Sequence, residues 1–142
     1  MKKLLAIALL SISTIGGIQK PEGWEIFEEV IFNTEYFEEV GAYFEAPTFN
    51  KELIALEKTE IMLSGYYIPL ELDSVFMISG LPFSSCFFCG GAGPETLAEI
   101  EFSELPKGLG PDEFIKVKGR LKLNKKDYNH LNFILQEAEI IK

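Results

Sequence analysis

The sequence predicts a mainly β protein, a five-stranded OB-like barrel with a helical or mixed N-terminal layer. Three observations lead to this fold class: five segments with strand-like patterning, a central glycine in two of them, and a long glycine-bearing loop between the second and third. The chain has 142 residues, 47% of them hydrophobic. That is enough for one domain with its own core and too little for two.

The predicted fold class rests on segments whose side chains alternate between apolar and polar. In residues 114–123 the side chains Lys116, Lys118, Arg120 and Lys122 alternate with Val117, Gly119, Leu121 and Leu123. Such alternation is typical of a strand with one buried and one wet face. The five candidates are residues 61–70, 75–79, 97–102, 114–123 and 133–141.

Glycines within two of these candidates favour a barrel over an open sheet. Gly65 and Gly119 each stand in the middle of a strand-like segment. A glycine there usually marks a bulge or a bend, which lets a small sheet curl and close. The loop between residues 80 and 95 then joins the second strand to the third, where we expect function to lie.

The segment before these strands is rich in aromatic residues and glutamate, and its secondary structure stays open. Between residues 21 and 47, apolar spacings of three and four fit amphipathic helices, but short runs such as residues 30–32 also suit strands. We interpret the aromatic rings as core packing, with an apolar ligand groove as the alternative. Residues 49–57 predict a short helix capped by Asn50, with Leu53, Ile54 and Leu56 facing inward.

The first 17 residues predict a signal peptide. Lys2 and Lys3 precede an apolar run over residues 4–10, which ends in small residues at Gly16 and Gly17. The run is too short to span a bilayer, which needs about 20 apolar residues. An uncleaved anchor or a buried first helix is the alternative. We therefore expect a single exported domain over residues 18–142, in the periplasm or cell envelope and without a membrane span.

Charge and motifs exclude several classes of function. The formal net charge is −9, so phosphate backbones are repelled and nucleic acid is not an expected partner. The chain has one histidine, no Gly-x-Ser-x-Gly elbow and no phosphate-binding glycine loop. These absences argue against classical hydrolysis and favour a binding role, with oligosaccharides and peptides as open ligand classes for such a barrel.

The chain's only two cysteines carry the clearest chemical signal. Cys86 and Cys89 enclose Phe87 and Phe88, and glycines follow at once. This spacing suits two corners of a metal site, a dithiol–disulfide redox pair or a small structural disulfide. A disulfide this tight gains little from loop closure, which keeps a functional role in view.

For a metal site, His130 is the third candidate ligand beside Cys86 and Cys89. It would serve only if the barrel brings its loop next to the cysteine loop; otherwise it is an exposed loop histidine. Glu95, water or a second subunit would complete a zinc site. Copper is the other candidate, because Met62 and Met77 offer thioethers, although their strand-like segments favour core positions.

Several short motifs resemble those of a known family. They are Pro47-x-Phe49, Ala55-Leu56-Glu57, the block Ser64-Gly65-Tyr66-Tyr67-Ile68-Pro69-Leu70, a cysteine-centred loop, and Val117-x-Gly119. Over about residues 24–141 the chain resembles an uncharacterised family of exported bacterial domains found near metal-linked ABC transporters. The resemblance implies an OB-like fold and an envelope location. The chain departs from the family at the loop, where members carry a histidine near the cysteine and this chain has Phe87 and Phe88.

Together these observations predict a non-enzymatic envelope module. Its cysteine loop would bind a soft metal ion, zinc or copper, through Cys86, Cys89 and His130, or would serve as an accessory to a metal-linked transporter. The alternatives are a thiol–disulfide redox protein and a purely structural binding domain whose loop is closed by a Cys86–Cys89 disulfide.

Overall fold

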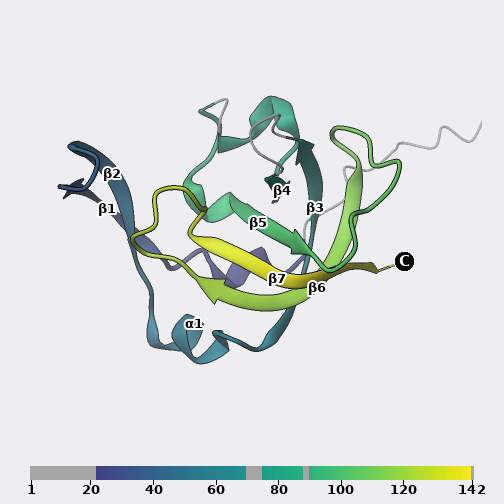
Figure 1. Ribbon diagram of the computed structural model, residues 1–142, viewed down its shortest axis with the longest axis horizontal. Helices are drawn as coiled ribbons and strands as arrows, with labels where there is room; N and C mark the ends of the chain where they lie inside the picture. Colours follow the sequence, from purple (N-terminus) through teal and green to yellow (C-terminus); the bar gives the residue numbers. More distant parts are fainter. Residues whose placement is uncertain (1–21, 70–74, 88–89, 142) are drawn as a thin grey trace, which may run out of the picture.

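The chain forms a closed five-stranded β-barrel in a computed structural model that describes residues 22–69, 75–87 and 90–141 (Figure 1). The barrel strands are β3 (Glu60–Pro69), β4 (Phe76–Ser79), β5 (Leu97–Phe102), β6 (Phe114–Leu123) and β7 (Phe133–Ile141). Their order is β3-β4-β5-β7-β6, and β6 pairs back onto β3. All pairs are antiparallel except β5 with β7. This arrangement confirms the predicted OB-like barrel, with each strand within one residue of its expected bounds; the expected end at Leu70 lies outside the described residues.

The alternation along β6 accounts for its two environments. Val117, Gly119 and Leu121 are buried inside the barrel, and the basic residues between them lie on its outer face. Three residues of that basic row form ion pairs with carboxylates of neighbouring segments. Lys116 lies 2.6 Å from Glu22 and Lys118 lies 3.6 Å from Glu60. Arg120 pairs with Glu137. These exposed pairs stabilise little individually, so the inner apolar row holds the strand in place.

Two central glycines lie where the strand pairing changes, one at a register shift and one at a change of partner strand. At Gly119 the β6–β7 register shifts, and an added Cβ would lie 3.0 Å from the Cβ of Leu135. Near Gly65 strand β3 passes from its partner β6 to its partner β4, and a Cβ there would run into the carbonyl oxygen of Ser79. Glycine is required at both positions by close approach of neighbouring strands.

The N-terminal segment closes one side of the barrel core. Phe27, just after the 3-10 helix η1 (Trp24–Ile26), is fully buried and stacks on Phe133 with ring centroids 4.0 Å apart. The indole nitrogen of Trp24 donates a 2.8 Å hydrogen bond to the carbonyl of Ser64. Burial of these rings ties the segment to β3 and β7. The core also contains Val30, Leu53, Leu63, Tyr67, Ile78, Ala98, Ile100, Ile115, Val117, Leu121, Leu135 and Ala138.

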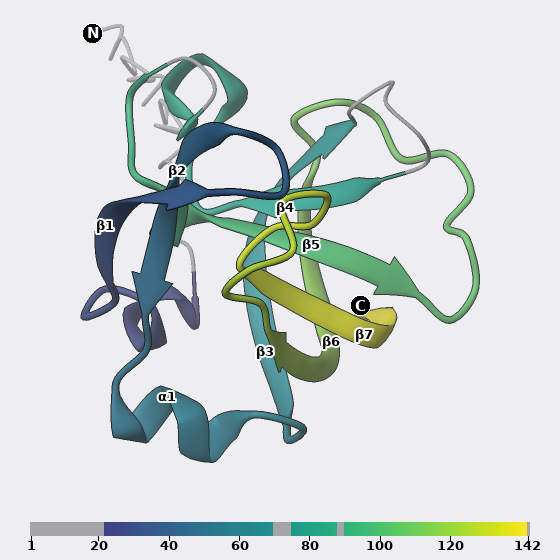
Figure 2. The same cartoon turned by 60° about the vertical axis from the view of Figure 1, so that its left-hand side comes forward.

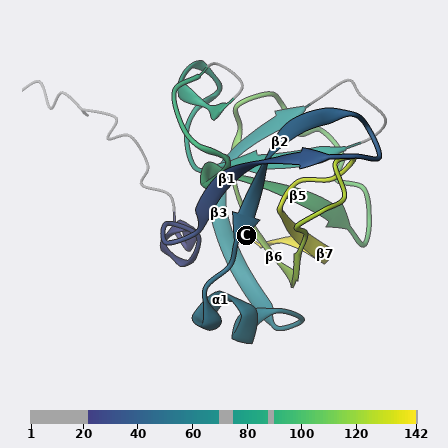
Figure 3. The ribbon, with the colours of Figure 1, turned by 90° about the vertical axis from the view of Figure 1, so that its left-hand side faces the viewer.

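The short helix α1 (Lys51–Leu56) lies at one end of the barrel (Figure 3). The side chain of Asn50 accepts a hydrogen bond from the backbone N–H of Leu53 at 2.8 Å, which confirms the predicted cap. Leu53 is buried and Leu56 packs against the core, but Ile54 is exposed, so its expected inward position was wrong. A helix of under two turns presents too narrow an inner face for all three.

Residues 31–48 form strands, which settles the choice between helix and strand left open for most of residues 21–47. Beside η1, the region forms a two-stranded antiparallel hairpin of β1 (Ile31–Phe37) and β2 (Ala42–Thr48), which lies outside the barrel sheet (Figure 2). The expected core packing of the aromatic rings is confirmed before the hairpin and was wrong for most rings on it. Trp24, Phe27 and Val30 are core residues, whereas Tyr36, Tyr43 and Phe44 are exposed on the hairpin.

The described residues contain no helix with the length and apolar character that a membrane span requires. The predicted signal peptide, residues 1–17, lies outside the part of the chain that the structure describes.

Candidate functional site

The cysteine loop covers the outer face of the barrel at β3, β4 and β5. Paired residues Ile68 and Met77 share that outer face, since their neighbours Tyr67 and Ile78 belong to the interior core. Cys86 is fully buried against this outer pair. The cysteine therefore anchors its loop on the wall of the barrel and leaves the next residue, Phe87, at the surface.

The structure tests the predicted metal ligands only in part, because Cys89 lies outside the described residues. Within the described ranges, Cys86 forms no disulfide, and no three histidine, cysteine or acidic side chains gather as a metal site. Met77 is buried in the same cluster as Cys86, as expected of a core position. Met62 is about half exposed, which corrects the core position expected for it.

The loop between β6 and β7 is held by the buried side chain of Asn124. Its amide nitrogen donates to the carbonyls of Asp127, His130 and Leu131 at 2.8 to 3.2 Å. Its carbonyl oxygen accepts from the backbone N–H groups of Lys126 and Asp127 at 3.3 and 3.0 Å. The side chain of Asn124 thus provides hydrogen-bond partners for the backbone groups of the loop, which fixes the loop's conformation.

A second buried polar residue, Glu99, fastens the far end of this loop to β5. Glu99 pairs with Met77 across the strands and so shares the outer face of the barrel. One carboxylate oxygen lies 2.8 Å from Nδ1 of His130, and the other accepts the backbone N–H of Leu131 at 3.0 Å. His130 is therefore an exposed loop histidine, as the alternative interpretation expected, but its ring is held by a hydrogen bond to Glu99.

This contact alters the titration of the imidazole. The hydrogen bond to Glu99 raises the pKa of His130 above its ordinary value, and the charges of Glu99 and Asp127 act in the same direction. Partial desolvation and the charge of Lys122 oppose that rise in pKa. The carboxylates prevail because they favour the protonated ring.

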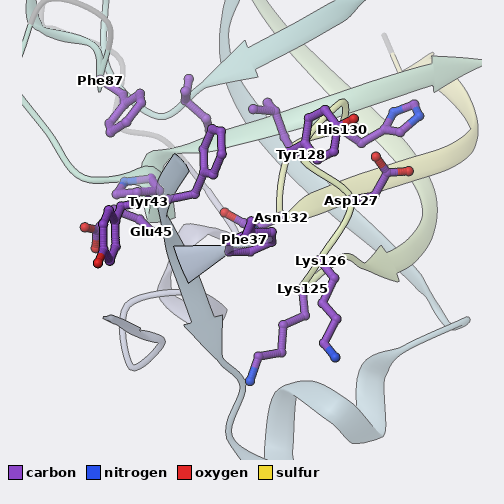
Figure 4. A pocket seen from close by; sticks show the side chains of 14 residues that line it. Phe37, Tyr43, Glu45, Phe87, Lys125, Lys126, Asp127, Tyr128, His130 and Asn132 are labelled. Atoms are coloured by element: carbon purple, nitrogen blue, oxygen red, sulfur yellow. The ribbon is translucent and has the colours of Figure 1, made fainter. Parts of the chain in front are cut away.

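A groove of about 350 Å³ opens where the hairpin, the cysteine loop and the β6–β7 loop meet (Figure 4). Its apolar walls and floor are Phe37, Tyr43, Phe44, Phe87, Pro94, Leu97, Tyr128 and Leu131, and its polar residues are Glu45, Lys125, Lys126, Asp127, His130 and Asn132. Tyr43 is 70% exposed and Tyr128 is 47% exposed. Large ring areas are therefore open to a ligand.

Ring contacts connect the hairpin to the β6–β7 loop. Phe44 stacks on Tyr128 with centroids 6.2 Å apart, and Phe37 meets Phe44 edge to face at 5.4 Å. Beside them, Lys125 lies 3.9 Å from Glu35 of β1. These contacts align the hairpin with a loop that Asn124 and Glu99 already hold, so the rings are preorganised.

The structure brings together several residues that the sequence treated separately. Phe87 and His130 line one groove, and Leu131 packs against the cluster that contains Cys86, so the cysteine and histidine loops are neighbours. Sequence reasoning missed Glu99, Asn124 and Tyr128. A charged residue within the apolar strand candidate 97–102 was the available signal for Glu99.

No protein-family model matches the chain, and no curated protein or solved structure matches it either. The fold and the groove define the class, an OB-like barrel with an aromatic surface site. The family resemblance over about residues 24–141 stays a prediction.

Proposed function

We propose that this chain is a non-catalytic binding module whose ligand occupies the aromatic groove. The observation that carries the proposal is a set of partly exposed rings, from Phe37, Tyr43, Phe44, Phe87 and Tyr128, gathered around one hollow. Large exposed apolar patches that are rimmed by polar residues mark binding grooves or interaction sites. Aromatic side chains also contribute disproportionately to binding energy.

The position of the groove on the barrel supports the same function. In OB-like barrels ligands commonly lie against the second and third strands and the loop between the fourth and fifth. Of the corresponding elements here, β5 contributes Leu97 to the groove lining, the β6–β7 loop contributes Lys125 to Tyr128 and His130 to Asn132, and β4 contributes no residue. The loop is fixed by buried Asn124 and Glu99, so little conformational entropy is lost when a ligand binds.

The groove's chemistry favours binding over catalysis. His130 and Glu99 form an acid–base pair, but the groove lining that the structure describes includes no serine, threonine or cysteine for the imidazole to activate. Glu99 instead orients His130 and closes the loop.

An NMR titration tests this function. The ¹⁵N-labelled protein is mixed in turn with short peptides and oligosaccharides, and we expect shift changes to cluster at residues 43–45, 87 and 125–132. Tyr128→Ala should weaken any such binding about tenfold or more, as loss of an interface hot spot does. Leu105→Ala removes an exposed apolar side chain that lies outside the groove, 68% exposed against 47% for Tyr128, and should leave the binding unchanged. Ligand shifts confined to another face would overturn the proposal.

Metal binding by the cysteine loop is a second candidate function. Met77 and Cys86 share one buried cluster, which brings a thioether and a thiol together, and soft metals such as copper(I) prefer sulfur ligands. Cys89 would supply another thiol, and His130 stands on the neighbouring loop. An exported location and a transporter partner accompany this candidate, as the sequence predicts.

Metal content separates the two functions. The full chain is purified without reducing agent, and its zinc and copper are measured beside its free thiols. Near-stoichiometric metal that disappears in the Cys86→Ser, Cys89→Ser double variant would establish the second candidate. Metal retained by the double variant, or none in the wild type, would reject it.

A further inference from the structure

The hairpin that forms one wall of the groove carries an unbalanced negative charge. Between residues 31 and 48 it contains Glu35, Glu38, Glu39 and Glu45 and no lysine, arginine or histidine. Among the described residues, Lys125 lies 3.9 Å from Glu35, and Lys126 lines a hollow with Glu35, Glu38 and Glu39. Carboxylates therefore outnumber cations on this rim.

Three of these carboxylates line a hollow next to the groove. This second hollow, of about 280 Å³, is lined by Glu35, Tyr36, Phe37, Glu38, Glu39 and Lys126. Phe37 and Lys126 also line the aromatic groove, so the two hollows are adjacent. An apolar subsite and an acidic subsite thus lie side by side along the hairpin.

Charge decides among the possible occupants. A second copy of the chain would bring the same acidic hairpin and a net charge of −9, so like charges would oppose self-association. Nucleic acid is repelled for the same reason. A neutral oligosaccharide would stack on the rings but would bring no cation to the excess carboxylates of the hairpin. A basic ligand matches both subsites.

We infer that the occupant is an extended, basic segment of another protein, with a proline or aromatic residue in the groove and a neighbouring lysine or arginine in the acidic hollow. The inference rests on the proposed binding function. Aromatic-lined grooves are suited to proline-rich segments, whose extended backbone is largely ordered before binding. The hairpin carboxylates add selectivity and speed association by attracting the cation.

Fluorescence anisotropy with matched peptides tests the inference. The probes are short labelled peptides with a common proline–tyrosine–proline core, flanked by two arginines, two glutamines or two glutamates. We expect affinity to fall in that order, and only the arginine peptide should weaken as salt rises.

Matched variants assign the effect to the hairpin. Glu38→Gln with Glu39→Gln should weaken the arginine peptide about three- to tenfold, from two exposed ion pairs, and leave the glutamine peptide unchanged. Glu104→Gln with Glu139→Gln makes the same charge change at a different hollow and should have no effect on either peptide.

The outcomes separate this inference from the function on which it rests. Equal affinity for the three peptides, or groove shifts with oligosaccharides alone, would overturn the basic-segment inference while the binding function stands. Arginine-dependent binding that Tyr128→Ala leaves intact would overturn the groove itself. Concentration-dependent dimerisation through the hairpin, seen by sedimentation, would assign the surface to a second copy instead.

Discussion

The carboxylate of Glu99 joins β5 to the β6–β7 loop through His130, with 2.8 Å between its Oε1 and the imidazole Nδ1. Glu99 is only 4% exposed, and its second oxygen holds the backbone of Leu131. A buried carboxylate is costly unless it is paired and hydrogen-bonded. The contact therefore fixes both the imidazole and one wall of the groove.

The titration of His130 should report this contact directly. His130 is the chain's only histidine, so its ring protons give an isolated NMR signal. We expect its pKa to lie above the ordinary value of about 6.5, because Glu99 stabilises the protonated ring. Glu99→Gln should return the pKa toward that value while still accepting from the N–H of Leu131. An unchanged pKa in this variant would show that Glu99 does not set it.

The same pKa shift gives stability a defined pH dependence. Because the folded-state pKa of His130 is raised, the contact's full contribution is present below the ordinary pKa of about 6.5 and is lost as pH rises through the folded pKa. The difference in Tm between wild type and His130→Gln should therefore be larger at pH 6 than at pH 9. A difference that grows with pH would contradict the assignment.

Asn124 should determine the order of the β6–β7 loop. Asn124→Ala removes every side-chain hydrogen bond at this buried position and should reduce the free energy of unfolding by about 1–3 kcal/mol. Amide exchange at Lys126 and Asp127 should accelerate, because their N–H groups lose an acceptor. Denaturant unfolding and hydrogen exchange measure the two effects.

A control within the same loop sharpens this test. Asn129 is exposed, and its side chain bonds only to Asp127 among the contacts described. Asn129→Ala should therefore change stability by less than about 0.5 kcal/mol. Equal losses in the two variants would mean that the loop does not depend on its buried asparagine.

The barrel was largely predictable from sequence because its strands repeat with a period of two. In residues 114–123 the alternating lysines and apolar residues exclude a helix, and Gly65 and Gly119 indicated curvature. The hairpin was not predictable. Its aromatic residues satisfy both spacings, and β1 and β2 are mostly exposed, so burial imposed no clear period.

The groove escaped sequence reasoning for a different reason. Its walls come from the hairpin, from residues 87 and 94–97, and from the β6–β7 loop, and only the closed barrel brings these segments together. Cys86 stood out by its rarity and proved to be buried, while the chemically ordinary Tyr128 lies in the groove. A rare residue type such as cysteine draws attention to its chemistry in a sequence. A binding surface depends on which distant segments the fold brings together, and the sequence does not display that directly.

Gly65 should be irreplaceable even by alanine. The added Cβ would run into the backbone carbonyl of Ser79, which cannot move without distorting β4. We expect Gly65→Ala to lower stability by about 1–3 kcal/mol, measured by denaturant unfolding. At Gly110 the nearest atom to an added Cβ is 3.9 Å away, so Gly110→Ala should stay within about 0.5 kcal/mol of wild type. Tolerance of alanine at position 65 would disprove the close approach.

Substitutions at Cys86 distinguish a packing role from a bonding role. In a Cys89→Ala background Cys86 is the lone thiol, and its full burial predicts slow reaction with thiol reagents in the folded protein. Cys86→Ala leaves a small cavity beside Ile68 and Met77, with an expected loss of about 1 kcal/mol.

Cys86→Ser keeps the size but places a hydroxyl among apolar neighbours, which should cost about 1–3 kcal/mol and exceed the loss in the alanine variant. Equal losses for serine and alanine in the Cys89-containing chain, together with a change in metal content or free thiols, would assign the sulfur a bond instead. Denaturant unfolding with thiol counting on the same samples decides between a packing role and a bonding role of Cys86. In a packing role the polar serine destabilises more than alanine, whereas in a bonding role both variants lose the sulfur and are affected equally.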